Sequence, residues 1–220
     1  MREFFFLRMS INIYIKKSVD KYYSEKILLY GPTPQGVDWS SVEVQERRFF
    51  QLCKILPENN IPFSFIDYGC GYGALWPYLN MNYQVTDYIG YDFSKTMVEA
   101  AILLHGDNNI LHWQEDLDSN QIADYVIASG IFNVKQEIDE KVWEDYMYEC
   151  IKKLDIHSKL GFSFNVLTKY SNLEFRREKL FYADPEQVFA FCKKNISENV
   201  ALLHNYGLYE FTILINKTLN

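Results

Sequence analysis

The sequence predicts an α/β fold with a doubly wound, mostly parallel seven-stranded sheet, a C-terminal antiparallel hairpin and an N-terminal helical cap. From residue 63 onward, short apolar runs alternate with helical patterns, and a glycine-rich turn follows the first run. Such alternation favours a parallel sheet, because parallel neighbours need a crossover connection. The last two runs, residues 199–204 and 208–216, are too close for a crossover helix, so they predict the hairpin.

The helical cap is predicted from two patterns before the first strand. Apolar residues at helical spacing indicate a short helix over residues 18–30, ended by a turn rich in glycine and proline. Ser40 and Glu43 form a capping box for a second helix. We therefore divide a single domain over residues 1–220 into a cap, residues 1–60, and a core, residues 61–220.

The core elements are expected in alternating order. Predicted strands cover residues 63–68, 88–92, 109–113, 123–128 and 160–167, and predicted helices cover residues 94–104 and 139–154. A third helix is expected after Asp184-Pro185, because Asp suits the N-cap and Pro suits the first helical position. Doubly wound sheets bind ligands at the carboxyl ends of their strands, so the candidate site lies there.

Composition limits the expected partners. The 220 residues are 48% hydrophobic and 17% aromatic, and their net charge is −7. An acidic chain is poorly suited to neutralise phosphates, so we expect a small-molecule partner and no nucleic acid. No apolar run approaches the about 20 residues of a membrane helix, and the run Phe4–Leu7 is too short for an export signal. We expect no membrane partner, and a monomer or homodimer.

The four cysteines indicate reduced thiols in the cytoplasm. Cys53, Cys70, Cys150 and Cys192 include no C-x-x-C pair and no histidine at metal-ligand spacing. We therefore expect no metal site.

A glycine turn carries the predicted chemistry. Gly69, Gly71 and Gly73 follow the first apolar run and precede a helix, where backbone N–H groups can approach a polar ligand. The glycines alone leave open both a dinucleotide site and a tight turn that binds nothing.

Three carboxylates narrow this choice. Asp67, at the end of the first strand, can receive an ammonium group. Asp92 closes the next strand, where a carboxylate can accept both ribose hydroxyls. Asp116 follows the third strand and is placed to meet an exocyclic amine on adenine. A single ligand that carries all three groups would account for the pattern.

These segments resemble the class I S-adenosylmethionine-dependent methyltransferases. Residues 65–73, 91–97, 115–117 and 124–133 look like the first to fourth motifs of that family, in the family's order. The resemblance covers about residues 63–216, including the terminal hairpin. It implies S-adenosylmethionine as the cofactor and S-adenosylhomocysteine as its product.

The resemblance also implies roles for individual residues. The glycines hold the methionine part, with Asp67 near its amino group, and Asp92 holds the ribose. Phe93 and Met97 pack on adenine, whose edge is contacted from the third motif, and the fourth motif lies under the sulfonium. The full set of expected cofactor-binding residues is Tyr23, Trp39, Asp67, Gly69, Cys70, Gly71, Gly73, Asp92, Phe93, Met97, Asp116, Leu117, Ser129, Gly130 and Ile131.

The implied function is transfer of a methyl group to an oxygen or nitrogen of a small-molecule acceptor by in-line displacement, in which positioning supplies most of the rate. The sequence indicates no catalytic residue, and His204 is the only candidate for a base. Two alternatives stay open. One is a module that binds S-adenosylmethionine without turnover. The other is an NAD-dependent oxidoreductase, which would need a second substrate domain and a hydride-handling residue.

Overall fold

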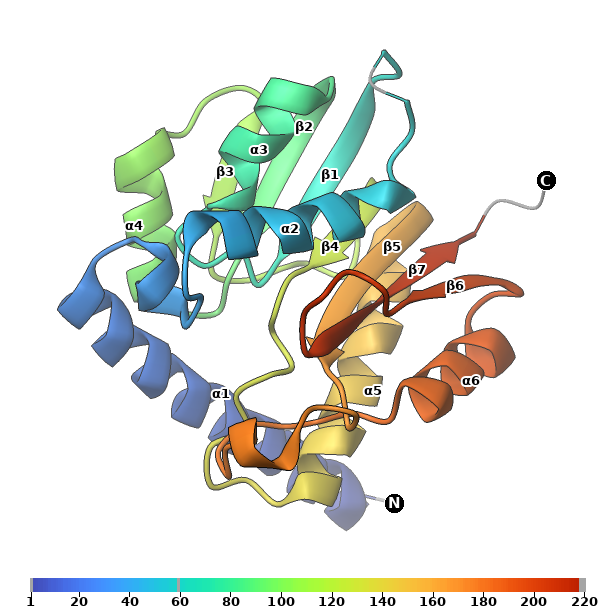
Figure 1. The fold of residues 1–220 in the computed structure, drawn as a ribbon. Helices are drawn as coiled ribbons and strands as arrows, with labels where there is room; N and C mark the ends of the chain where they lie inside the picture. The colour runs from blue at the N-terminus through green and yellow to red at the C-terminus, as the bar shows by residue number, and fades with distance from the viewer. Residues whose placement is uncertain (1, 59, 218–220) are drawn as a thin grey trace.

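The computed structural model describes residues 2–58 and 60–217, with side chains from residue 10 onward. Within these residues a seven-stranded sheet is formed by β1 (Phe63–Tyr68), β2 (Val85–Tyr91), β3 (Leu111–Gln114), β4 (Ala123–Ala128), β5 (Ser158–Leu167), β6 (Asn199–Leu203) and β7 (Glu210–Asn216). The strand order is β3-β2-β1-β4-β5-β7-β6 (Figure 1). Neighbours from β3 to β5 pair in parallel, whereas β7 is antiparallel to both β5 and β6. The predicted fold class is confirmed.

The helices lie before, between and after these strands. The α-helices are α1 (Arg2–Tyr30), α2 (Val42–Leu52), α3 (Leu75–Asn82), α4 (Lys95–His105), α5 (Glu140–His157) and α6 (Pro185–Asn195). Short 3-10 helices are η1 (Pro34–Val37), η2 (Cys53–Ile55) and η3 (Leu173–Phe175). As predicted, Asp184 caps α6, because its side chain accepts hydrogen bonds from the N–H groups of Glu186 and Gln187.

Two predictions about the N-terminal helices are wrong in detail. α1 is far longer than the predicted helix over residues 18–30, because packing of residues such as the fully buried Ile15 adds to local propensity. The N-cap of α2 is Ser41, which accepts from the N–H of Val44 at 3.3 Å, and not Ser40. The turn of η1 continues through Trp39, whose N–H donates to the carbonyl of Pro34, so the helix begins one residue later than expected.

Each face of the sheet carries its own apolar core. Successive side chains of a strand point to opposite faces. Phe65 accordingly packs in a cluster with residues of α2, α3 and α4, whereas Ile66 packs in a cluster with residues of α1, α5 and α6. Full burial of such side chains stabilises the fold by about 1.5–3 kcal/mol each.

The position of α1 bears on the candidate site. It crosses the carboxyl-terminal edge of the sheet, from α4 toward α5 (Figure 1). Ser24 donates to Thr96 at the start of α4 (3.2 Å), and Ile15 and Val19 join the core on the α5 side. Parallel strands are usually connected through a helix, yet residues 115–122 join β3 to β4 without one. α1 therefore covers sheet residues that a crossover helix would otherwise reach.

Two further properties hold for the described residues. None of their helices combines the length and the apolar character needed to span a bilayer. The four cysteines are free and buried.

Candidate functional site

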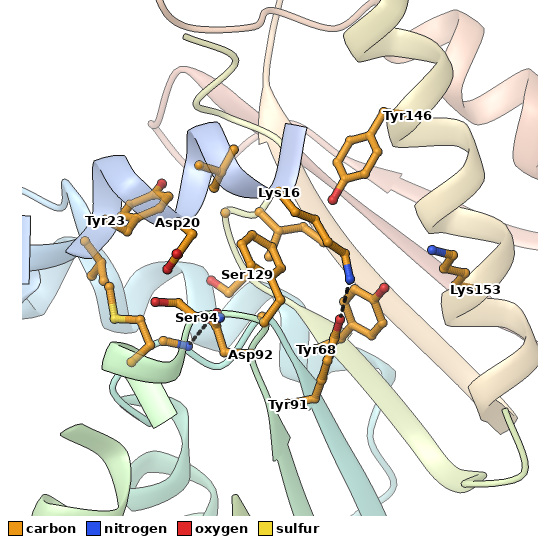
Figure 2. A pocket seen from close by; sticks show the side chains of 18 of the residues that line it. Lys16, Asp20, Tyr23, Tyr68, Tyr91, Asp92, Ser94, Ser129, Tyr146 and Lys153 are labelled. Carbon is orange, nitrogen blue, oxygen red and sulfur yellow. Dashed lines mark hydrogen bonds between the residues drawn. The ribbon is translucent and has the colours of Figure 1, made fainter. Parts of the chain in front are cut away.

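A cavity lies between α1 and the carboxyl ends of the strands (Figure 2). This main cavity encloses about 860 Å³ of empty space, including open solvent at its mouth. Most residues expected to bind the cofactor line it: Tyr23, Trp39, Gly69, Gly71, Asp92, Phe93, Met97, Ser129, Gly130 and Ile131. A smaller cavity of about 360 Å³ shares Trp39, Gly69, Gly71 and Ser129 with it and adds Asp67 and Cys70.

The turn after β1 is built from glycines with left-handed backbones. The φ angles of Gly69 and Gly71 are +78° and +55°, a region where side chains are strained. The N–H groups of Gly69 and Cys70 donate to the carbonyl of Tyr91 at 2.7 and 3.0 Å, which fixes the turn on the end of β2. A Cβ at Gly71 would meet only Val37, at 3.6 Å, so the protein leaves this space to the cavity.

Asp92 organises two backbone segments of the site. Its Oδ2 accepts from the N–H of Gly71 at 3.0 Å, and its Oδ1 accepts from the N–H of Ser94 at 2.9 Å. Burial raises the pKa of Asp92 to about 6, although both hydrogen bonds favour the ionised form. Each carboxylate oxygen has a further lone pair, so both can also accept ligand hydroxyls.

Asp67 lies at the smaller cavity and is almost completely buried. The hydroxyl of Tyr88 donates to its Oδ2 at 2.7 Å. Burial raises the pKa of Asp67 to about 7, and the hydrogen bond from Tyr88 offsets part of that rise. A cationic ligand group beside Asp67 would favour the ionised carboxylate.

We expect the unliganded protein to become more stable as the pH falls from roughly 8 to 5. The pKa values of Asp67 and Asp92 in the folded state, about 7 and about 6, lie above the ordinary value of 3.8. The folded protein therefore binds protons that the unfolded chain does not. The resulting stabilisation is complete below the unfolded pKa and is lost as the pH rises through the folded values.

Urea denaturation at stepped pH measures this effect. Asp67→Asn should flatten the pH dependence, since an amide does not titrate. Asp87→Asn, at the exposed start of β2, serves as the control and should keep the slope of the parent. Identical slopes for Asp67→Asn and the parent would contradict the expectation.

A buried polar network holds the loop after β4. The N–H of Gly130 donates to Asn165 Oδ1 at 2.7 Å, and Asn165 Nδ2 donates to Glu210 Oε1 at 3.1 Å. Arg48 Nε donates to Glu210 Oε2 at 2.8 Å, and the side chain of Glu210 is fully buried. The network therefore joins α2, β5 and β7 to a residue that lines the main cavity.

Trp39 covers the same loop. The guanidinium of Arg48 lies 3.9 Å from the centre of its ring. A Cβ at Gly130 would come within 2.5 Å of the Trp39 ring, so glycine is required there. Next to it, the buried Ser129 hydroxyl has no hydrogen-bond partner among the described residues, although Ser129 lines both cavities. An unpaired buried hydroxyl costs free energy, so this position suits a ligand with a polar group.

Four of the expected site residues line neither cavity. A Cβ at Gly73 would lie 2.5 Å from the ring of Trp113 on β3, so this glycine allows the turn to pack against that ring. Asp116 is exposed, and Leu117 packs against the core on the α5 side. His204 is exposed just after β6 and lines neither cavity, so the structure offers no support for it as a base.

Several lining residues were missed from the sequence. They are Lys16 and Asp20 on α1, Tyr68 and Tyr91 at the ends of β1 and β2, and Tyr146 and Lys153 on α5. Lys16, Asp20 and Tyr23 are spaced i, i+4 and i+7, a pattern that would have placed them on one helix face if the helix had been extended before residue 18. Tyr68 and Tyr91 directly precede Gly69 and Asp92, so their place in the site could have been predicted from the ends of the two strands.

Comparison with known proteins gives one relative of high identity. No family model matches the sequence. A protein of Mycobacterium tuberculosis (strain ATCC 25618 / H37Rv) named "Putative methyltransferase Rv1506c" is 46% identical over 156 residues. The matched region spans 71% of this chain and 94% of that protein.

Solved structures share the fold at low sequence identity. The N-methyltransferase NodS from Bradyrhizobium japonicum WM9, in complex with S-adenosyl-L-homocysteine, has a TM-score of 0.63 at 13% identity, covering 90% of this chain and 100% of that chain. The DhpI complex with SAH has a TM-score of 0.61 at 11% identity, with 91% and 95% covered. Human N-acetylserotonin methyltransferase in complex with SAM has a TM-score of 0.57 at 12% identity, with 79% and 51% covered.

Proposed function

This chain belongs to the class I S-adenosylmethionine-dependent methyltransferases, and we propose that it methylates an oxygen or nitrogen atom of a small-molecule acceptor by in-line displacement. The observation that carries the proposal is the main cavity, where the glycine turn, Asp92 and the loop after β4 converge. S-Adenosylmethionine, when bound, supplies an electrophilic methyl group on a sulfonium. The human structural neighbour is named for a small molecule, N-acetylserotonin.

The residues of the main cavity fit this cofactor. Asp92 would hold the ribose hydroxyls with the same oxygens that accept from the N–H groups of Gly71 and Ser94. Gly71 has no side chain to fill the cavity, and the unpaired Ser129 hydroxyl would find a polar partner on the cofactor. In the smaller cavity Asp67 would receive the amino group of the methionine part, which would favour its ionised carboxylate.

The chain acts on the reaction mainly by placing the two reactants. α1 and Trp39 line the cavity and would restrict water, and the network through Glu210 holds the loop after β4 in place. The acceptor atom brings its own lone pair, so no covalent chemistry falls to a side chain. The free, buried cysteines suit the reducing cytoplasm, where we place the reaction.

Radiolabelled methyl transfer to a panel of metabolites tests the proposal, with calorimetric titration of S-adenosylhomocysteine in parallel. We expect S-adenosylhomocysteine to bind and at least one small molecule to be labelled at oxygen or nitrogen. Binding without labelling of any acceptor would favour a module that lacks turnover. Preferential labelling of a polynucleotide would contradict the small-molecule proposal.

Asp92→Ala is expected to weaken binding of S-adenosylhomocysteine by about 1–3 kcal/mol, the range for a lost charge-assisted hydrogen bond. The same calorimetric titration measures it, with Asp87→Ala, on the strand that Asp92 follows, as the control. If Asp92→Ala folds normally and binds as tightly as the parent, Asp92 does not hold the ribose.

A further inference from the structure

One end of the main cavity lies on the α5 side of β1 and β2, where no helix connects β3 to β4. Tyr68 and Tyr91 project into it from the ends of these strands. Lys16 reaches it from α1, and Tyr146 and Lys153 reach it from α5 (Figure 2). We call this group of five residues the phenol–ammonium end of the cavity.

The polar groups of this end are gathered around shared space. Lys16 Nζ lies 3.4 Å from the hydroxyl of Tyr91, and the Tyr68 and Tyr91 rings are 4.9 Å apart. The hydroxyl of Tyr146 is directed into the same region, and the amine of Lys153 points toward it from α5 (Figure 2). All of these groups can donate hydrogen bonds to an oxygen anion.

The positive charge at this end has no close counter-ion. Among the described side chains, no carboxylate oxygen lies within 4.0 Å of the amine of Lys16 or Lys153. Burial lowers the pKa of Lys16, and the charge of Lys153 lowers it further, whereas Asp116 and Asp92 raise it by smaller amounts. The two ammonium groups thus repel each other across the cavity, and an anion between them would relieve that repulsion.

The opposite end of the cavity has the complementary character. Asp20 and Asp92 lie there beside Ser94 and Tyr23 (Figure 2). S-Adenosylmethionine carries a sulfonium and an ammonium group against a single carboxylate, so its net positive charge favours the acidic end. The charge distribution therefore separates the cavity into an acidic end for the cofactor and a basic end for a second molecule.

We propose that the phenol–ammonium end binds an anionic oxygen group, a carboxylate or a phosphate, of the methyl acceptor. This inference rests on the proposed function and narrows its substrate class to acceptors that carry such a group. The apolar lining of Val19 and Trp143 would hold the uncharged part of the acceptor.

Three probes of similar shape test the proposal on the full chain saturated with S-adenosylhomocysteine: benzoate, phenyl phosphate and the neutral benzamide. Their affinities are measured from chemical-shift changes in titrations followed by NMR. The variants are Lys16→Met and Lys153→Met. Lys17→Met and Lys152→Met are matched controls, because each is the exposed neighbour of one of these lysines and lines neither cavity.

We expect at least one of the two anions to bind at least tenfold more tightly than benzamide. Lys16→Met and Lys153→Met should each weaken that binding at least fivefold, and the controls should change it less than twofold. A preference for benzoate would identify a carboxylate acceptor, and a preference for phenyl phosphate a phosphate acceptor.

Equal binding of benzamide, absence of anion binding, or anion binding that survives both lysine variants would each overturn the proposal. Calorimetry with S-adenosylhomocysteine distinguishes failure of the anion-binding proposal from failure of the proposed function. If S-adenosylhomocysteine binds and the anions do not, only the acceptor class is wrong.

Discussion

We expect Gly71→Val to abolish binding of S-adenosylhomocysteine. Gly71 lines both cavities, and a side chain there meets only Val37 of the protein, so its bulk enters the space reserved for ligand. The φ of +55° also strains a β-branched residue, which costs about 1–3 kcal/mol. A shift of the backbone would in addition break the hydrogen bond from the Gly71 N–H to Asp92.

Gly71→Ala separates the ligand effect from the strain. Its methyl group fits the protein but still occupies the cavity, so the melting temperature should fall little while affinity is largely lost. Gly207→Ala is the matched control, because Gly207 has a φ of +71° and open surroundings, with Arg47 as the nearest contact at 3.7 Å. Both variants carry similar backbone strain, and only Gly71→Ala should lose binding. Normal affinity of the Gly71→Ala variant for S-adenosylhomocysteine would show that the glycine turn is not part of the binding site.

We expect Arg48→Met to lower the free energy of unfolding by about 3–5 kcal/mol, because the substitution leaves a buried charge without its partner. Glu210 is fully buried, and burial already raises its pKa despite the Arg48 guanidinium. Without Arg48 the carboxyl takes up a proton more readily, so the loss of stability should shrink as the pH falls. Urea denaturation followed by tryptophan fluorescence at two pH values measures both effects.

Two further variants test whether the uncompensated charge is the cause. Arg48→Met combined with Glu210→Gln removes both charges and should recover much of the lost stability. Arg47→Met, at the exposed neighbouring position of α2, should leave stability within about 0.5 kcal/mol of the parent. If the double variant is no more stable than Arg48→Met, the loss arises from packing on Trp39 and not from the charge.

The bounds of a strand could be predicted from the sequence where both faces of the strand are buried. β1 and β4 begin and end where the apolar runs at residues 63–68 and 123–128 indicate, because these central strands are covered on both faces. The start of β2 was missed, because Thr86 and Asp87 are exposed polar residues and the apolar run begins only at Tyr88. Periodicity reports burial, so it cannot locate the part of a strand that leaves the core.

α1 could not be delimited for a related reason. Its buried residues serve different clusters: Ile15 and Val19 pack on the α5 side of the sheet, whereas Ile27 packs with Tyr72 and Met97. No single apolar stripe therefore runs along the helix. The motif residues of the site were predictable because they are attached to strand ends. Lys16 and Lys153 reach the cavity only through tertiary packing, which spacing along the chain does not reveal.

The missing crossover helix between β3 and β4 has a consequence for how the cavity opens. Its cover is α1, which joins the rest of the chain at Gly31, a residue in the left-handed region with a φ of +69°. A cover joined in this way can open locally while the sheet stays folded. A ligand that binds only the closed form raises the free energy of that opening, by about 2.7 kcal/mol at a hundredfold excess over Kd. Ligand binding should therefore slow amide hydrogen exchange along α1, which supplies part of the cavity lining.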